Sequence, residues 1–239
     1  MGGGCSSNSR GRRTFASPYV RCMSKDRLSY SGGGQEGSYE LSYRLACGKL
    51  ATIGDIEEQC RRAGACYIAP GKVIIDYLAQ SYSITLSDAK IARENSETEV
   101  PLRDKILILH YFTMAKGTPA TGILITYKQL PGGLSYFPVF AHRAITPLVK
   151  YFGNNPEMLT KVATAKLEGH EMDFGDASVA INAFSRVPVI LVLWRGDEEV
   201  APSANILFDA NISDYLSTED VAVLCETIAW RLVKDMRSA

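Results

Sequence analysis

The sequence predicts an α+β fold, and the distribution of its strand-like and helix-like runs carries that prediction. Strand-like runs gather in an early set within residues 65–86 and a late set within 176–208, and helix-like runs lie around and between them. This separation argues against a regular alternation of parallel strands and helices. We therefore expect a mixed or mainly antiparallel sheet, packed against helices around Ile106 and Val221.

Composition divides the chain into a tail and a body. Residues 1–35 are rich in Gly, Ser and Arg, which favours disorder because so few apolar groups can be buried. They carry six of the 26 basic and one of the 26 acidic residues, so the tail is +5 and residues 36–239 are −5. We predict a disordered basic tail, 1–35, and a single α+β domain, 36–239.

The first half of the body begins with helices. Apolar positions predict one amphipathic helix from Gly37 to about Thr52, and Asp55 is expected to cap a short second helix that Gly64 ends. Short apolar runs separated by turn residues then predict an antiparallel meander, with strands at 65–69, 72–77 and 82–86 and a loop at 89–100.

The middle of the chain is mainly helical. Pro101 suits the first position of a helix whose run to Ala115 is apolar on every side, which predicts burial around its circumference. Further patterns predict, in order, a strand at 123–127, a turn at 130–133, a helix at 137–152 with irregular starts at its prolines, and a helix at 156–167.

The late strands end in the final helix. Alternation over 176–184 predicts a half-buried strand, and the continuous apolar run Pro188–Trp194 predicts a central strand covered on both faces. With the strand at 205–208 it forms an antiparallel hairpin with a long acidic tip. Ser217 and Asp220 have the spacing of a capping box that opens the last helix.

Several classes of protein are disfavoured by composition. A formal net charge of zero argues against nucleic-acid binding held mainly by phosphate contacts. The sequence has no apolar stretch near the roughly 20 residues of a membrane span, and no apolar signal segment. Its six cysteines lack the spacing of a disulfide framework. We predict a cytoplasmic protein that binds neither nucleic acid nor membrane.

His110 is the first candidate site residue, because it lies in the most apolar helix. An imidazole there is suited to bind a ligand or act as a general base. The alternative, which we favour, is a core histidine bonded to a nearby backbone carbonyl. His142 and His170 are expected on a helix face and in a loop. Glu219 and Asp220 are accounted for by the electrostatics of the helix start.

Acidic and amide side chains near the late hairpin are the other candidates. Asp197, Glu198 and Glu199 could bind a cation or exchange protons, although a solvated turn is the favoured interpretation. Asp209 follows an apolar strand, with Asn205 near it, where a cleft could form. Its alternative role is a local turn or cap.

Several segments together resemble the domain-of-unknown-function 3786 family of anaerobic bacteria and archaea, over about Ser38 to Val233. The segments, in order, are Pro101–Tyr111, Lys116–Pro119, Leu130–Gly133, Tyr136–Pro138, Trp194–Glu199 and Asn205–Asp209. The resemblance implies a link to corrinoid or iron–sulfur proteins, because some members carry those labels and some an extra cysteine-rich module. This chain departs from such members, since it has no C-x-x-C pair, and we assign no metal ligands.

Three functional hypotheses follow. The first, which we favour, is a non-catalytic binding or accessory protein for corrinoid, iron–sulfur or one-carbon enzymes, with a protein partner and an unidentified cofactor, if any. The second is a small metal-assisted enzyme that uses Asp209 with Asp197 or Glu198 and one histidine, and it requires these groups to converge in one pocket. The third is a homo-oligomeric structural protein with a large exposed apolar patch.

Overall fold

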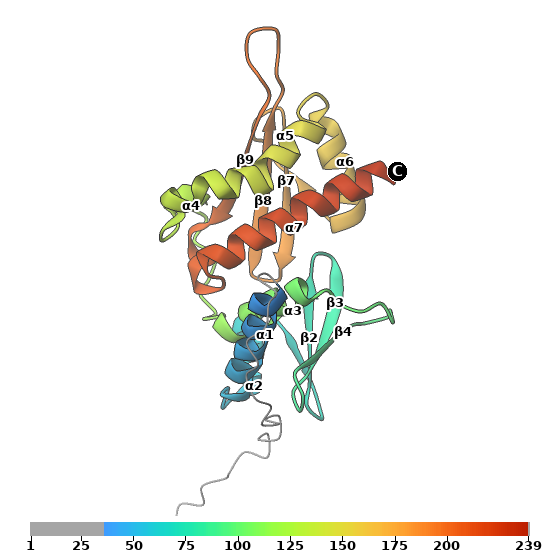
Figure 1. Cartoon of the computed structure of the whole chain (residues 1–239), viewed down its shortest axis with the longest axis vertical. Helices are drawn as coiled ribbons and strands as arrows, with labels where there is room; N and C mark the ends of the chain where they lie inside the picture. The colour runs from blue at the N-terminus through green and yellow to red at the C-terminus, as the bar shows by residue number, and fades with distance from the viewer. Residues whose placement is uncertain (1–35, 239) are drawn as a thin grey trace, which may run out of the picture.

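The structure is a computed structural model that describes residues 36–238 (Figure 1). The prediction of a disordered tail over 1–35 lies outside the described residues. The predicted α+β class is confirmed, because a nine-stranded antiparallel sheet in the described part of the chain packs against helices.

The first half contains the predicted helices and meander. Its elements are α1 (Glu36–Ala51), α2 (Ile56–Ala63), β1 (Cys66–Ile68), β2 (Lys72–Tyr77), β3 (Gln80–Thr85), β4 (Lys90–Arg93) and α3 (Leu102–Met114). Asp55 caps α2 by accepting a hydrogen bond from the Glu58 amide, and Gly64 ends the helix with a φ of 61°. The prediction of a loop over 89–100 is wrong in part. β4 pairs with β3, and Ile91 is buried there while the adjacent Lys90 is exposed.

The middle of the chain holds a helix that begins earlier than predicted. The elements are β5 (Leu124–Thr126), η1 (Tyr127–Gln129), α4 (Gly133–Phe140), the π-helical η2 (Ala141–Ile145), α5 (Thr146–Phe152) and α6 (Pro156–Leu167). The predicted start at residue 137 is wrong, because Pro138 is accommodated inside α4. Gly133 permits the earlier start, since a Cβ there would lie 2.0 Å from the Tyr127 carbonyl oxygen.

The last part follows the prediction closely. It consists of β6 (His170–Glu171), β7 (Ala177–Phe184), β8 (Val187–Trp194), β9 (Ser203–Asp209), η3 (Ala210–Asp214) and α7 (Thr218–Arg237). β8 and β9 form the predicted antiparallel hairpin. Ser217 and Asp220 form the predicted capping box at the start of α7.

The main path of the sheet has the order β4-β3-β2-β7-β8-β9-β5, with β1 on β2 and β6 on β7. The meander and the late strands meet through one register pair, Tyr77 with Phe184. One further backbone bond joins them, 3.0 Å from the Leu78 nitrogen to the Ala183 oxygen. The backbone pairing along the main path of the sheet is therefore shortest between β2 and β7.

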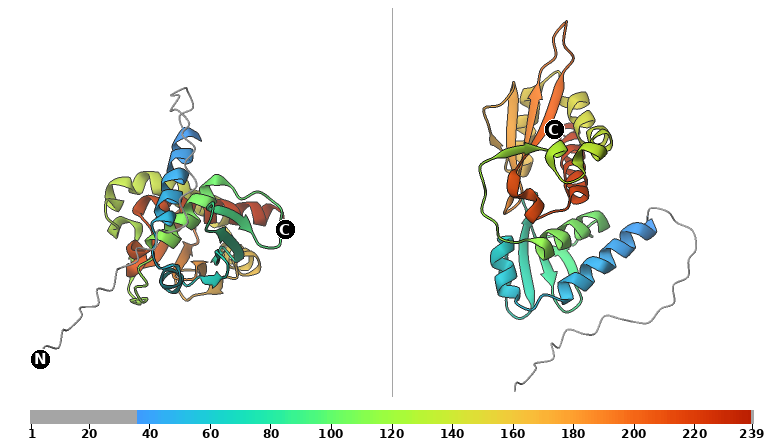
Figure 2. Two further views of the ribbon diagram at one scale, coloured as in Figure 1. Left: turned by 90° about the horizontal axis from the view of Figure 1, so that it is seen from below. Right: turned by 90° about the vertical axis from the view of Figure 1, so that its left-hand side faces the viewer.

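Helices cover one side of the late strands (Figure 2, right). Val189, Leu191 and Leu193 of β8 belong to the main hydrophobic core. Ile190 and Val192 point to the opposite face and are still buried, and the chain at Gly175 passes beside Val192. The predicted burial of this strand on both faces is confirmed.

An aromatic column crosses the sheet where this backbone pairing is shortest. The ring centroids of Tyr77 and Phe184 are 4.8 Å apart, those of Phe184 and Tyr111 4.1 Å, and those of Tyr111 and Tyr215 6.0 Å. All four side chains are almost fully buried. The column connects the meander, α3, β7 and the residue after η3.

Candidate functional site

The acidic candidates lie at opposite ends of the β8–β9 hairpin. Asp197 and Glu198 belong to the exposed loop 195–202 at its tip, which we call the acidic arm and which projects beyond the body (Figure 1). Asp209 lies at the other end of β9, and Asn205 lies between, with its side-chain oxygen bonded to the Ile206 amide. The structure does not bring Asp197 or Glu198 together with Asp209 in one pocket.

Asp209 is a buried carboxylate whose oxygens are occupied by nearby donors. It accepts hydrogen bonds from the amides of Thr121, Gly122 and Asn211 and from the Thr121 hydroxyl, at 2.8–3.0 Å. Burial by itself raises the pKa of this carboxyl, but the hydrogen bonds outweigh burial and lower the pKa below its ordinary value. The carboxylate thus fixes the chain at 121–122 and caps η3.

His110 forms a side-chain pair with Asp220. Its Nδ1 lies 2.7 Å from Asp220 Oδ1, and the two side chains are 21% and 10% exposed. The other carboxylate oxygen of Asp220 accepts the Ser217 hydroxyl at 2.6 Å. The expected backbone carbonyl partner of His110 is therefore wrong. Asp220 caps α7 and also orients an imidazole from α3.

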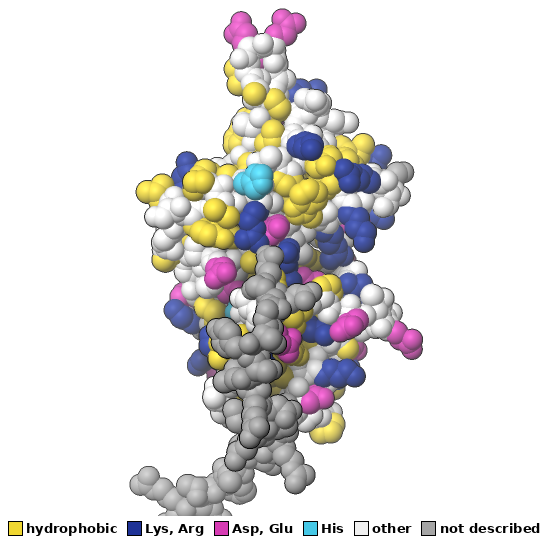
Figure 3. Space-filling view, viewed as in Figure 1, with side chains coloured by type: hydrophobic (Ala, Val, Ile, Leu, Met, Phe, Trp, Pro, Cys, Tyr) yellow, Lys and Arg dark blue, Asp and Glu magenta, His cyan; other side chains and the backbone are white. Residues whose placement is uncertain are grey.

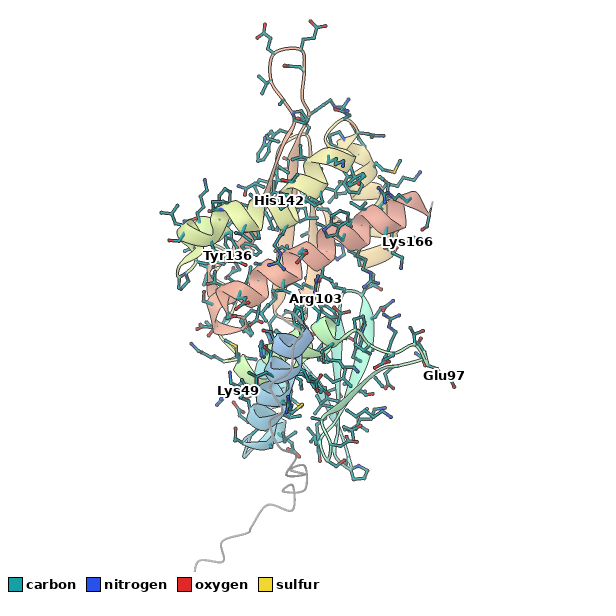
Figure 4. All side chains as sticks on the ribbon, viewed as in Figure 1. Lys49, Glu97, Arg103, Tyr136, His142 and Lys166 are labelled. Carbon is teal, nitrogen blue, oxygen red and sulfur yellow. The ribbon has the colours of Figure 1, made fainter. Side chains whose placement is uncertain are left out.

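The pair lies where α3 crosses α7, and an ion pair joins the same helices. Arg103 Nη1 of α3 lies 3.5 Å from Glu226 Oε2 of α7, and Arg143 of η2 donates to that oxygen at 3.0 Å. Figure 4 shows Arg103 pointing toward α7 at the junction of the two parts of the chain. These contacts fix α3 against α7 and so fix His110 against Asp220.

The loop after α3 packs on η3, which precedes α7 in the chain. Lys116 Nζ lies 2.7 Å from Asp214 Oδ1, and the Thr118 hydroxyl donates to the other oxygen at 2.7 Å. The bonds from Lys116 and Thr118 lower the pKa of the Asp214 carboxyl. The side-chain amide of Asn211 donates to the carbonyls of Thr118 and Pro119. Three segments that carry the family resemblance, at 101–111, 116–119 and 205–209, are thus held close to η3 and α7.

This arrangement is suited to proton transfer. A carboxylate at Nδ1 fixes the orientation of a histidine ring and leaves Nε2 as the atom that can accept or deliver a proton. Sequence reasoning identified His110 and missed its partner. The two residues are 110 positions apart and so give no local spacing signal, and the capping box already accounted for Asp220.

The tip of the acidic arm is organised by its own backbone. Asp197 Oδ1 accepts the amides of Glu199 and Val200 at 2.8 and 2.7 Å, and these bonds lower the pKa of the Asp197 carboxyl. The base is anchored by Arg195, whose guanidinium pairs with Glu157 and whose amide donates to Asp176. Glu198 and Glu199 are the acidic side chains of the tip left for other partners.

The remaining histidines and the buried thiols lie apart from this pair. His142 is exposed on η2, as Figures 3 and 4 show, and His170 is exposed on β6. Burial raises the pKa of the Cys225 thiol, and burial with nearby Cys66 raises that of Cys60 to about 11, so both favour the protonated form. Within residues 36–238, no group of three His, Cys, Asp or Glu side chains is placed to hold a metal ion.

A surface groove of about 650 Å³ lies between α6 and the β6–β7 strands. It has side chains of both charges, including Glu157, Lys161 and Asp176, and no candidate from the sequence lines it. Sequence reasoning missed this groove, although its walls follow one another in the chain, because the lining residues form no motif that indicates how α6 packs on the strands.

No helix in the part of the chain that the structure describes is long and apolar enough to cross a membrane.

The comparisons with known proteins identify the family. No curated protein matches the chain, and no solved structure matches it. The domain of unknown function DUF3786 matches residues 55–231, which include both members of the His110–Asp220 pair. The chain therefore belongs to the DUF3786 family.

Proposed function

We propose that this chain is a cytoplasmic, non-catalytic binding or accessory protein for corrinoid or iron–sulfur enzymes of one-carbon metabolism in anaerobes. The link to those enzymes rests on the family resemblance. The binding role rests on an exposed apolar surface, because apolar groups that stay accessible in a folded protein often contact a partner.

The observation that carries this proposal is the set of exposed apolar side chains that α4 presents around its exposed surface. Leu134, Tyr136 and Val139 are 70%, 37% and 43% exposed on one eight-residue helix. α4 lies at the edge of the molecule (Figures 1 and 2), and Figure 4 shows Tyr136 on the side of α4 toward α7, where its hydroxyl accepts a hydrogen bond from Arg143 at 3.4 Å. We call these three side chains the α4 patch. A partner that covers it would bury apolar surface at little cost in ordering a helix that is already formed.

The test is partner capture with matched variants. Tagged protein is recovered without oxygen from its native cell extract, and bound proteins are identified by mass spectrometry and by their cofactor absorbance. Leu134→Ser with Val139→Ser should lose a corrinoid or iron–sulfur enzyme that the unchanged protein retains. Leu41→Ser with Leu45→Ser is the control, since these leucines are 53% and 60% exposed on α1. Recovery of the same proteins by all three forms would refute the proposal.

A second candidate function is a small enzyme with His110 as general base, favoured by the 2.7 Å contact with Asp220. It differs from the predicted enzyme, because Asp197, Glu198 and Asp209 have no part in it. The sequence has three histidines, so His142→Gln with His170→Gln leaves His110 alone.

Reaction of that double variant with diethyl pyrocarbonate tests the second candidate. A catalytic Nε2 must be accessible, so His110 should be modified in the folded protein at a rate comparable with a free imidazole. If His110 reacts only after unfolding, the ring serves the α3–α7 contact alone and the enzyme candidate is eliminated.

A further inference from the structure

A second surface, distinct from the α4 patch, combines aromatic and basic side chains at the C-terminal half of α7. Tyr151 of α5 lies between two cations, with Lys150 Nζ 5.4 Å and the Arg237 guanidinium carbon 4.8 Å from its ring centroid. Trp230, 47% exposed, meets Tyr151 edge to face with centroids 6.3 Å apart. Exposed Lys234 lies four residues after Trp230, on the same side of the helix.

We call Lys150, Tyr151, Trp230, Lys234 and Arg237 the aromatic–basic cluster. Figure 3 shows hydrophobic and basic side chains adjoining over this part of the molecule. The cluster is basic although residues 36–239 as a whole carry 20 basic and 25 acidic side chains. Its positive charge and flat aromatic surfaces favour an acidic segment that also carries an apolar group.

The acidic arm of the same chain has that chemistry. Glu198 and Glu199 occupy its tip, and the adjacent Val200 is 63% exposed. The arm projects away from the body, with acidic side chains at its end (Figures 1 and 3). Asp197 already holds the turn, so docking orders few additional groups.

We propose that the aromatic–basic cluster binds the acidic arm of a second copy of this chain. Two copies related by a two-fold axis exchange arms, so that each cluster receives the partner's arm and the contact is made twice. Glu198 and Glu199 lie against Lys150 and Lys234, and Val200 packs on Trp230. This goes beyond the proposed accessory function, which uses the α4 patch.

The test is a charge exchange on pure protein, followed by sedimentation velocity over a range of concentrations. Glu198→Lys with Glu199→Lys reverses the arm, and Lys150→Glu with Lys234→Glu reverses the cluster. Arg195, Asp197 and Arg237 stay unchanged because they hold the arm or Tyr151 in place. Each variant alone should dimerise at least about tenfold more weakly, since like charges then face each other.

Mixing the two variants distinguishes a direct contact from a general charge effect. The mixture should recover a heterodimer, because the reversed arm meets the reversed cluster in one of its two contacts. Lys49→Glu and Glu97→Lys, exposed positions on α1 and in the loop before α3, are controls that should leave dimerisation unchanged (Figure 4).

Three results would overturn the proposal. The unchanged protein could remain monomeric, the dimer could be indifferent to both reversals, or the mixture could fail to associate. Binding of a single-stranded oligonucleotide that is lost in the cluster variant, with no dimer, would assign the cluster to another ligand and likewise overturn it. Because only pure protein is used, none of these results bears on partner capture by the α4 patch.

Discussion

The two ends of the β8–β9 hairpin carry acidic residues in opposite environments, one buried and one exposed. At one end Asp209 is buried and accepts hydrogen bonds from the chain at 121–122 and from Asn211. At the other end Glu198 is exposed at the tip of the arm. The two carboxylates are separated by the length of one strand, and one stabilises the fold while the other is available to a partner.

The position of an acidic residue beside an apolar strand does not by itself decide whether the residue stabilises the fold or contacts a partner. Its role depends on the donors that the folded chain brings to it, and at Asp209 three of these donors come from Thr121 and Gly122, about 88 positions earlier. Removing a satisfied buried carboxylate should therefore cost much more stability than removing an exposed one.

The largest effect is expected from Asp209→Ala. The substitution leaves the amides of Asn211, Thr121 and Gly122 without their acceptor, so the free energy of unfolding should fall by roughly 2–4 kcal/mol. Urea denaturation followed by circular dichroism measures this change. An unfolding free energy equal to that of the unchanged protein would remove the structural role assigned to Asp209.

His110→Ala should have the next largest effect. It deprives the buried Asp220 carboxylate of its imidazole partner while the Ser217 contact remains, which predicts a loss of roughly 1–2 kcal/mol. The exposed His142→Ala is the control and should stay within about 0.5 kcal/mol. Equal effects of the two substitutions in urea denaturation would show that the α3–α7 pair adds nothing to stability.

Lowering the pH should reduce the contribution of Asp209 to the free energy of unfolding. Its folded-state pKa is lowered, so its contribution is complete above the unfolded value, about 3.9, and is lost as the pH falls through the folded value. The difference in unfolding free energy between the unchanged protein and Asp209→Asn should thus shrink on acidification. If this difference in unfolding free energy did not change with pH, the lowered pKa of Asp209 in the folded state would be contradicted.

The Asp104 carboxyl has a pKa shift in the direction opposite to that of Asp209, so the two can be compared. Burial raises its pKa, although Tyr77 donates to it at 3.3 Å. Its contribution is therefore most favourable below the unfolded pKa and declines as the pH rises to the raised folded value. Relative to the unchanged protein, Asp104→Asn should become more stable over that rise. If the unfolding free energies of Asp104→Asn and Asp209→Asn, each relative to the unchanged protein, changed with pH in the same way, the opposite directions of the two pKa shifts would be refuted.

The smallest effect is expected at the arm. Glu198→Gln removes an exposed charge, so the unfolding free energy should change by no more than about 0.5 kcal/mol. Thermal unfolding at protein concentrations too low for association measures this without contribution from a dimer. A larger loss would mean that the tip stabilises its own chain.

Local sequence signals predicted the elements whose causes are local. The Asp55 cap, the end of α2 at Gly64 and the Ser217–Asp220 capping box each follow from the spacing of a few residues, and all three were predicted correctly. The continuous apolar run of β8 likewise reported burial on both faces. These predictions needed no knowledge of the rest of the fold.

Most of the failures depend on partners distant in the chain or on tertiary accommodation. The exception is β4, whose four residues alternate too briefly to signal a strand and which pairs with the adjacent β3 across a short turn. α4 contains Pro138 and begins before it because Gly133 can approach the Tyr127 carbonyl. The donors of Asp209 and the imidazole beside Asp220 come from other segments. Pattern and spacing contain no information about such pairs.

The aromatic column has a consequence for the cooperativity of unfolding. Only one register pair joins the meander to the late strands, so backbone pairing alone would let either part melt separately. Tyr77, Phe184, Tyr111 and Tyr215 come from both parts, and their stacking is lost if either part unfolds. We therefore propose that residues 36–239 melt in one two-state transition, with the column as the device that couples the two parts.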